Sequence, residues 1–563
     1  MKRTLRNAMM MLLASAPFVA SSQTRYAEEV FDNSEISIET GVVYASNIDF
    51  LYSNFQGANT LTDIGTLSAI ADAGGEFPAA YYNPLDESTD VKLKAITMDV
   101  YAPSSDVDDV TERPVIIYLH TGDFLPTPIN GSTTGLMNDS SAVALCKGWA
   151  RRGFVAISVD YRLGWNPIAS TVQERRGTLL NAVYRAIHDL KASIRYVRNS
   201  AINGDNPFGV DETRIVVYGQ GSGGYVAQAA ATLNQPEELF LEKFRPNPFD
   251  ETVSYIDTLQ VGTIAGFGFQ NSLNLYRESE ISAEFHMSIN AGGALADESW
   301  LEAGDVPMCA INCVRDDFAP FDQGTVIVPT TQEEVVDVHG ANFFIQKANQ
   351  LGNNDVFVNI PDGDPYTDAA RALYGTTVTT ASAEGSVTIN TEVEGLFPLI
   401  RPLRPFLANE SGPWEWWDPT SPIAQYEVAP GITAHMASLN SNPDMSPEKG
   451  MTYVDSIQGY IVPRIMCALD LPEAICSTPD AVEEVSNTSF KVYPNPANDR
   501  FMISSNEVMN SVVVFDITGK MVASRNAINV TTLDMNVSEL PTGVYLVQVS
   551  TDKARMTQRL IVE

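Results

Sequence analysis

The chain has 563 residues, of which 70 are acidic and 35 basic, so that its formal net charge at pH 7 is −35. Such a charge repels phosphate backbones and anionic lipid surfaces, which excludes nucleic-acid binding as the leading function. Hydrophobic residues make up 44% of the chain and charged residues 19%. This composition excludes an intrinsically disordered or fibrous protein and predicts a globular protein with a large core.

The first 22 residues have the composition of a signal peptide. Lys2, Arg3 and Arg6 precede an apolar run at 8–20, which is too short to cross a bilayer at about 20 residues but long enough for the core of a signal peptide. Small residues follow, and cleavage after Ser22 would begin the mature chain at residue 23. An ordinary buried first helix is the alternative. No other segment has the composition of a transmembrane helix, so we expect an exported protein without a stable membrane span.

The middle of the chain alternates short apolar runs with helical patterns, which predicts βαβ units and a mostly parallel sheet. Each run is bounded and rich in Val, Ile and Phe, as buried parallel strands are. Apolar residues at helical spacing over 183–197 predict an amphipathic helix before the third strand. The predicted strands are Pro114–His120, Phe154–Tyr161, Arg214–Gly219, Phe285–Ala291, Pro307–Cys313 and Asp355–Ile360.

The composition changes near the C-terminus. The polar, acidic stretch 477–489 has no apolar periodicity and predicts a linker. From residue 490 to residue 563, short alternating runs separated by turn signals predict a small all-β sandwich.

Cysteine and histidine usage offers no metal or cofactor site. Five cysteines in a chain of this length, without a C-x-x-C pair, do not make a disulfide scaffold. In an oxidising compartment Cys467 and Cys476 could be bridged, although sequence alone does not assign the pairs. The spacing of His and Cys offers no zinc site, and the Asp-rich loops at 203–206 and 362–364 lack EF-hand spacing. We expect no cofactor, and calcium binding at these loops stays open.

Four motifs of the middle region are typical of one family. They are DVYAP at 99–103, YLHTGDF at 118–124, VDYRLG at 159–164 and VYGQGSGG at 217–224. Their order and spacing resemble the carboxylesterase and lipase branch of the α/β-hydrolases. The resemblance implies a doubly wound, mostly parallel sheet within residues 23–476, with a cap insertion at 362–450. It also implies a Ser-His-Asp triad at the C-terminal edge of the sheet.

The C-terminal region resembles a second family. Its motifs are YPNP at 493–496, DITGK at 516–520, LPTGVY at 540–545 and LIVE at 560–563. They resemble the type A (Por) C-terminal sorting domain of the type IX secretion system of Bacteroidetes. The resemblance implies the type IX secretion machinery as partner and a location on the outer-membrane surface or outside the cell. A ligand-binding sandwich is the alternative interpretation.

The expected nucleophile position is altered. In the family's elbow, glycines lie two residues before and two after the serine, because strand and helix pass too close for side chains. On that template Gly219 and Gly223 take the flanking places, and Gly221 is the apex, which has no oxygen for attack. A shift by one residue puts Ser222 at the apex, but Gln220 would then crowd the turn.

The acid position resembles the family and the base position does not. After the strand 307–313, Asp316 takes the acid position with Asp317 as its neighbour. In the loop after the strand predicted at 355–360, where the family carries its histidine, the chain has Asp364. A carboxylate with a pKa near 4 is a poor proton acceptor for a serine hydroxyl. His435 is the one candidate base, if its segment folds back over the site.

The oxyanion loop also departs from the family pattern. His120 opens the motif and is normally structural there, and the family's three glycines are replaced by Thr121, Gly122 and Asp123. A carboxylate beside a developing oxyanion raises the barrier unless it points away. The resemblance places the oxyanion hole and pocket at His120, Gly122, Asp123, Gly219, Gly223 and Gly224.

These changes favour a secreted, esterase-like protein that binds a small-molecule or ester-type ligand without hydrolysing it. Loss of nucleophile and base together leaves only oxyanion-hole and binding effects. One alternative is an active serine esterase or lipase in which Ser222 is the nucleophile, His435 the base and Asp316 the acid. Another is a non-catalytic surface adhesion protein that uses its acidic face and the tryptophans at 414–417.

Overall fold

The computed structural model describes residues 24–316, 318–327, 334–380, 385–401, 411–476, 490–516, 520–538, 540–551 and 555–562. The chain divides into two compact units, Met1–Ser477 and Thr478–Glu563. The predicted signal peptide at 1–22 and the predicted linker at 477–489 lie outside the described residues.

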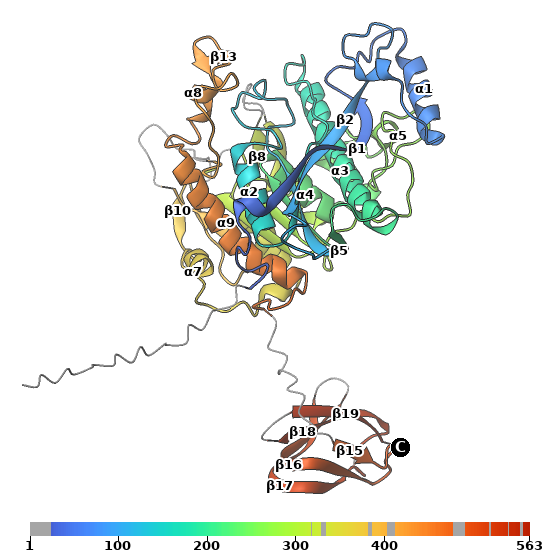
Figure 1. The fold of residues 1–563 in the computed structure, drawn as a ribbon, viewed down its shortest axis with the longest axis vertical. Coiled ribbons are helices and arrows are strands. Elements are labelled where there is room, and N and C mark those ends of the chain that lie inside the picture. The colour runs from blue at the N-terminus through green and yellow to red at the C-terminus, as the bar shows by residue number, and fades with distance from the viewer. Residues whose placement is uncertain are drawn as a thin grey trace, which may run out of the picture. The chain divides into compact units, whose positions relative to one another are not determined.

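The larger unit is built on an eight-stranded sheet (Figure 1). Its strand order is β1-β2-β4-β3-β5-β6-β7-β12. The pairs β1–β2 and β2–β4 are antiparallel and all other neighbours are parallel. The strands are β1 (Ile36–Asp49), β2 (Lys92–Pro103), β3 (Arg113–Leu119), β4 (Val155–Val159), β5 (Val210–Gln220), β6 (Ser288–Ala291), β7 (Met308–Cys313) and β12 (Leu396–Leu399).

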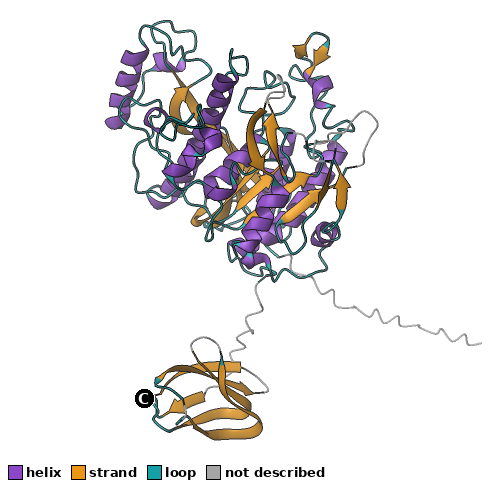
Figure 2. Cartoon of the chain, turned by 180° about the vertical axis from the view of Figure 1, so that it is seen from behind, coloured by secondary structure: helices purple, strands orange, loops and turns teal. Residues whose placement is uncertain are grey.

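Alternate side chains of the central strands enter two separate cores. In β3, Val115 and Ile117 pack with α3, α4 and α6, whereas Ile116 and Tyr118 pack with α2 and α9. Helices therefore cover both faces of the sheet (Figure 2), and the predicted doubly wound, mostly parallel sheet is confirmed. The helices are α2 (Ser140–Arg151), α3 (Val172–Ile202), α4 (Ser222–Thr232), α6 (Ala341–Gln350) and α9 (Pro447–Ala468).

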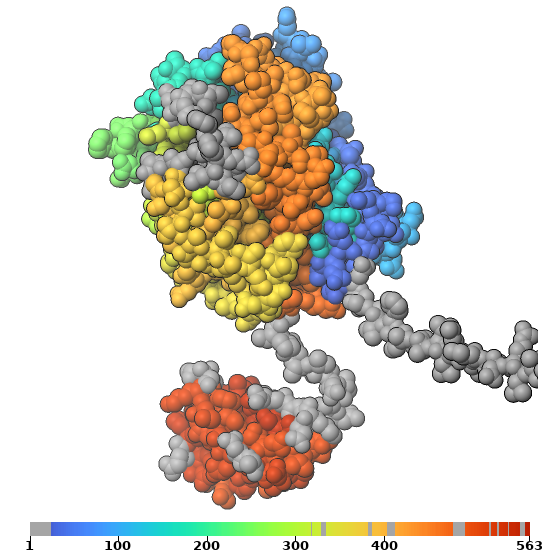
Figure 3. Space-filling model, turned by 90° about the vertical axis from the view of Figure 1, so that its left-hand side faces the viewer, coloured from blue at the N-terminus to red at the C-terminus, as the bar shows by residue number. Residues whose placement is uncertain are grey.

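Smaller elements surround the sheet. Residues of the segments 334–380, 385–400 and 411–470, yellow and orange in Figure 3, build one face of the larger unit. Within the described residues, no helix combines the length and the apolarity needed to cross a membrane. The smaller helices are α1 (Thr60–Asp72), α5 (Thr258–Val261), α7 (Pro365–Arg371) and α8 (Ala434–Ser438). The hairpins are β8 (Gln323–Ile327) with β9 (Glu334–His339), β10 (Thr377–Thr379) with β11 (Ser386–Thr388), and β13 (Glu427–Ala429) with β14 (Ile432–Thr433).

One predicted strand is wrong. Residues 355–360 begin with a 3₁₀ turn at Asp355–Phe357 and belong to no sheet. The buried side chains, Phe357 and Ile360, are three residues apart, while Val358 is 68% exposed, so the burial repeats with a helical and not a strand period. The place beside β7 is taken by β12, whose Phe397 is paired with Ile311.

The range 362–450, which we expected to form a cap, therefore contributes β12 to the central sheet. The part after it, from residue 411 to α8, carries the hairpin β13–β14. A disulfide joins Cys467, near the end of α9, to Cys476, the pair that we expected could be bridged.

The smaller unit is all-β. Its strands enclose a core that includes Val512, Val514, Val547 and Leu560. The motif residue Asn495 ties the start of the unit to its last strand, because its side chain donates to the carbonyl oxygen of Arg559 and accepts from the amide of Ile561 at 2.7 and 2.8 Å. The strands are β15 (Phe490–Tyr493), β16 (Arg500–Asp516), β17 (Met521–Asn536), β18 (Gly543–Thr551) and β19 (Arg555–Val562).

Candidate functional site

The turn between β5 and α4 has the sharp geometry of a nucleophile elbow. Gly221 lies at its tip with φ +53° and ψ −119°, a conformation that side chains rarely adopt outside strained functional turns. A Cβ on Gly219 would lie 2.0 Å from the carbonyl oxygen of Gly223, and one on Gly223 would lie 2.4 Å from that of Leu119. This close approach requires glycine at both flanking positions and leaves Gly221 between them as the apex.

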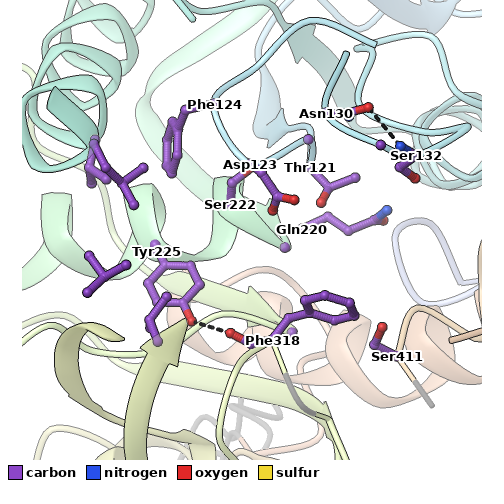
Figure 4. Close-up of a pocket in the computed structure, with 18 of the residues that line it drawn as sticks. Thr121, Asp123, Phe124, Asn130, Ser132, Gln220, Ser222, Tyr225, Phe318 and Ser411 are labelled. Carbon is purple, nitrogen blue, oxygen red and sulfur yellow. Dashed lines mark hydrogen bonds between the residues drawn. The ribbon is translucent and has the colours of Figure 1, made fainter. Parts of the chain in front are cut away.

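The space that a nucleophilic side chain would use at the apex is filled by Thr121. A Cβ built on Gly221 would lie 2.1 Å from Thr121 Oγ1 and 2.8 Å from Thr121 Cβ. Figure 4 shows the Thr121 side chain above this turn, beside Asp123 and Gln220. A hydroxyl is thus present next to the apex, but it comes from the loop after β3.

Ser222 begins α4 and is almost fully buried. Its Oγ lies 3.2 Å from the hydroxyl of Tyr161, which donates to the carbonyl oxygen of His120 at 2.8 Å. The hydroxyl of Ser222 is therefore hydrogen-bonded to Tyr161, which in turn binds the backbone of the residue before Thr121. This position is typical of the residue that follows the nucleophile, whose backbone N–H belongs to an oxyanion hole.

His120 holds the loop after β3. Its ring stacks on Tyr161 with centroids 4.3 Å apart, and its Nε2 lies 3.6 Å from Asp160 Oδ1. The side chain is 1% exposed, so the described contacts fit a structural imidazole. The neighbouring Gly122 has φ +123° and lies so close to Gly135 that a Cβ would come within 2.8 Å of it.

Asp123 places a carboxylate in the cavity in front of the elbow. Its backbone has φ +54°, and its carbonyl oxygen accepts the indole N–H of Trp165 at 2.8 Å. Burial raises the pKa of Asp123 to about 6. The loop thus presents an acid where the family presents glycine, as the sequence indicated.

Asp316 follows β7 and lines the same cavity. Its Oδ1 accepts the amides of Phe318 and Ala319 at 2.8 and 3.1 Å. Its Oδ2 faces Gly292, since a Cβ there would lie 3.8 Å from this oxygen and from the ring of Trp414. Its neighbour Asp317 lies outside the described residues.

The two candidates for the base position lie elsewhere. Asp364 caps α7, where it accepts the amide of Thr367 at 2.7 Å, and the strand from which we placed it near the histidine position is absent. The last strand of the sheet is β12, and the sequence from 400 to 410 after it contains no histidine. His435 lies in α8, where its Nδ1 accepts the indole N–H of Trp417 at 3.1 Å. Neither Asp364 nor His435 is among the described residues that line the cavity.

The cavity has a volume of about 970 Å³ and contains an acid that sequence reasoning missed. Glu415 accepts hydrogen bonds from Gln220 Nε2 and from Thr134 Oγ1, both at 3.0 Å. Burial, with the nearby Asp139 and Asp123 charges, raises the pKa of Glu415 to about 8. Its position between the tryptophans of the segment 413–418 is the one signal in the sequence that predicts a buried environment.

Two family models match the chain. One, described as BD-FAE, matches residues 98–324, and one, described as secretion system C-terminal sorting domain, matches residues 491–563. A comparison with curated protein sequences found no match.

Solved structures give matches of low identity. Thermogutta terrifontis esterase 2 phosphonylated by cyclosarin is 20% identical, with 40% of this chain and 69% of that chain covered and a TM-score of 0.25. The butyrate-bound form of esterase 2 from the same organism is 18% identical, with 44% and 77% covered and a TM-score of 0.25. On the fold and the family matches, residues 98–324 belong to an esterase-like α/β-hydrolase domain and residues 491–563 form a type IX secretion system sorting domain.

Proposed function

We propose that this protein is secreted to the cell surface and that its esterase-like cavity binds a small molecule without hydrolysing it through a serine triad. The observation that carries the proposal is Gly221, which has the backbone of a nucleophile elbow and no side chain to attack with. The sorting tail implies secretion through the type IX system.

The surroundings of the apex support a binding role. Thr121 fills the space that a side chain at position 221 would occupy. The residues around the apex are therefore packed against a glycine, and no space is left where a serine side chain would lie. No histidine is among the described residues that line the cavity. A serine hydroxyl without a base close to it is not activated for attack.

The alternative triad of Ser222, His435 and Asp316 finds less support in the geometry. Ser222 Oγ is bound to Tyr161, and the ring nitrogen of His435 is bound to Trp417. Of these three residues, only Asp316 and Ser222 are among the described residues that line the cavity. Catalysis by this set would require His435, which is not among the described lining residues, to leave Trp417 and approach Ser222.

The test compares esterase activity in the full-length protein and two variants. We expect the wild type to hydrolyse p-nitrophenyl butyrate no faster than the buffer does and to remain unlabelled by a fluorophosphonate probe, because the described side-chain partner of Ser222 Oγ is the hydroxyl of Tyr161 and not a base. Ser222→Ala should behave as the wild type does, and so should His435→Gln. Turnover or labelling that disappears in Ser222→Ala would overturn the proposal.

A further inference from the structure

The Asp, Glu, Lys, Arg and His side chains of the described cavity lining are all acidic. Four acidic residues line it, Asp123, Asp316, Glu415 and Glu427, and no Lys, Arg or His is among the described lining residues. Esters hydrolysed in a cavity of this charge would leave a carboxylate product facing like charges, which is unfavourable. The charge therefore favours a ligand that is itself positive.

Glu415 and Gln220 form the polar centre of this lining. The amide nitrogen of Gln220 donates to Glu415 Oε1 at 3.0 Å, which directs the amide oxygen of Gln220 to a different partner. That oxygen, Oε1, is buried and has no hydrogen-bond partner among the described residues, and the Gln220 side chain is 1% exposed. Buried acceptors are nearly always satisfied in folded proteins, so a donor from a ligand fits here.

Asp123 and Glu415 both line the cavity, and the charge of Asp123 is one of the causes that raise the pKa of Glu415, after burial and the charge of Asp139. Burial raises the pKa of both, to about 6 and about 8. The described residues do not gather three or more metal-binding side chains at any point. A positive organic group therefore fits the two carboxyls better than a metal ion does, because buried carboxylates are stabilised by a paired cation.

One wall of the cavity is apolar. Helix α3 contributes Leu179, Leu180, Val183 and Ile187 to its wall, and the segment after α4 contributes Leu233 and Leu239. A volume of about 970 Å³ lies at the upper end of the usual range for small-molecule sites. The wall can cover a long alkyl or polycyclic body, whose removal from water favours binding.

We propose that the ligand is an organic ammonium ion with a large apolar body. The ammonium group lies between Glu415, Asp123 and Gln220 Oε1, and the apolar body lies against the side chains of α3. The inference names the ligand class for the binding function proposed above and rests on it.

The experiment measures binding of three probes of equal chain length, decylamine, decanol and decanoate, to the full-length protein by titration calorimetry below their micelle concentrations. At about pH 8.5 the amine is protonated and both carboxyls are largely ionised. We expect decylamine to bind at least about tenfold more tightly than decanol, and decanoate to bind most weakly. Equal affinities for the amine and the alcohol would overturn the inference, and so would binding of none of the three.

Two variants locate the effect. Glu415→Gln keeps the size of the side chain and should reduce decylamine affinity by about tenfold while decanol affinity stays unchanged. If Glu415→Gln fails to fold, Asp123→Asn tests the same ammonium site, again by its effect on decylamine affinity relative to decanol affinity. The matched control is Glu237→Gln, at an exposed glutamate outside the cavity lining. An amine preference that survives in both variants would overturn the assignment of the ammonium site, whereas ester turnover would overturn the binding function itself.

Discussion

At the residue scale, the site depends on two neighbouring positions. Gly221 keeps the backbone conformation of the elbow, and Thr121 occupies the volume in front of it. The sequence predicted Gly221 at the apex because the glycine spacing of the motif is local. It did not predict the role of Thr121 or of Glu415, since Glu415 meets Gln220 across 195 residues of chain. Contacts of this separation leave no periodic signal in a sequence.

We predict that Gly221→Ala is destabilising by about 1–3 kcal/mol, because the new Cβ meets Thr121 in a backbone region unfavourable to side chains. Denaturant unfolding of Gly221→Ala, Thr121→Gly and the double variant measures the coupling. When Thr121 is already replaced by glycine, Gly221→Ala should lower the free energy of unfolding by less than it does in the wild type. The control is Gly74→Ala, where φ is +62° and no atom lies within 4 Å of the added Cβ. Additive effects of the two substitutions would show that Thr121 does not fill the apex.

We predict that stability falls as pH rises from about 5 to about 8.5. The folded-state pKa of Glu415 is raised to about 8 and that of Asp123 to about 6, above the unfolded values of about 4. The folded state therefore holds more protons in this window, and the stability present below the unfolded pKa is lost as the pH passes the folded pKa. Melting temperatures across the window should decline less in Glu415→Gln than in the wild type. An equal decline would contradict the assignment.

At the element scale, the central parallel strands could be predicted because they are short Val- and Ile-rich runs buried on both faces. β12 could not, because its four residues include Pro398 and are shorter than the apolar run at 355–360 that competed for its place. β1 was missed because most of its residues are exposed or half-buried, as befits an edge strand. The apolar count of a segment therefore identified β3 to β7 but missed the inner strand β2 and failed at both edges.

Glu394 lies next to the edge strand β12 and links it to two helices. We predict that Glu394→Ala is destabilising by about 3–5 kcal/mol. It precedes β12 and pairs with Arg371 of α7 at 2.6 Å and with Arg464 of α9 at 2.9 Å. Arg464 is fully buried, so removal of the carboxylate leaves a buried cation without its partner. Thermal unfolding measures the loss, with the exposed Glu237→Ala as control. A change no larger than that of the control would contradict the prediction.

At the scale of the whole molecule, the two units have separate cores and separate predicted tasks. We predict that a chain ending at Ser477 keeps the fold and the ligand binding of the larger unit but is no longer exported across the outer membrane. Fractionation of cells that possess a type IX system, with the full chain as control, locates both forms. Equal amounts of the two forms outside the cell would contradict a sorting role for the tail.

Parallel pairing aligns Leu119 at the end of β3 with Gly219 near the end of β5, so that Thr121 and Gly221 leave the sheet at the same level. The two loops share one volume, so a serine side chain at position 221 has room only if Thr121 is replaced by a smaller residue or moves away. Each single step alone loses packing, whereas both together restore it. Restoring a nucleophilic side chain to this elbow by design therefore calls for a paired substitution at 121 and 221.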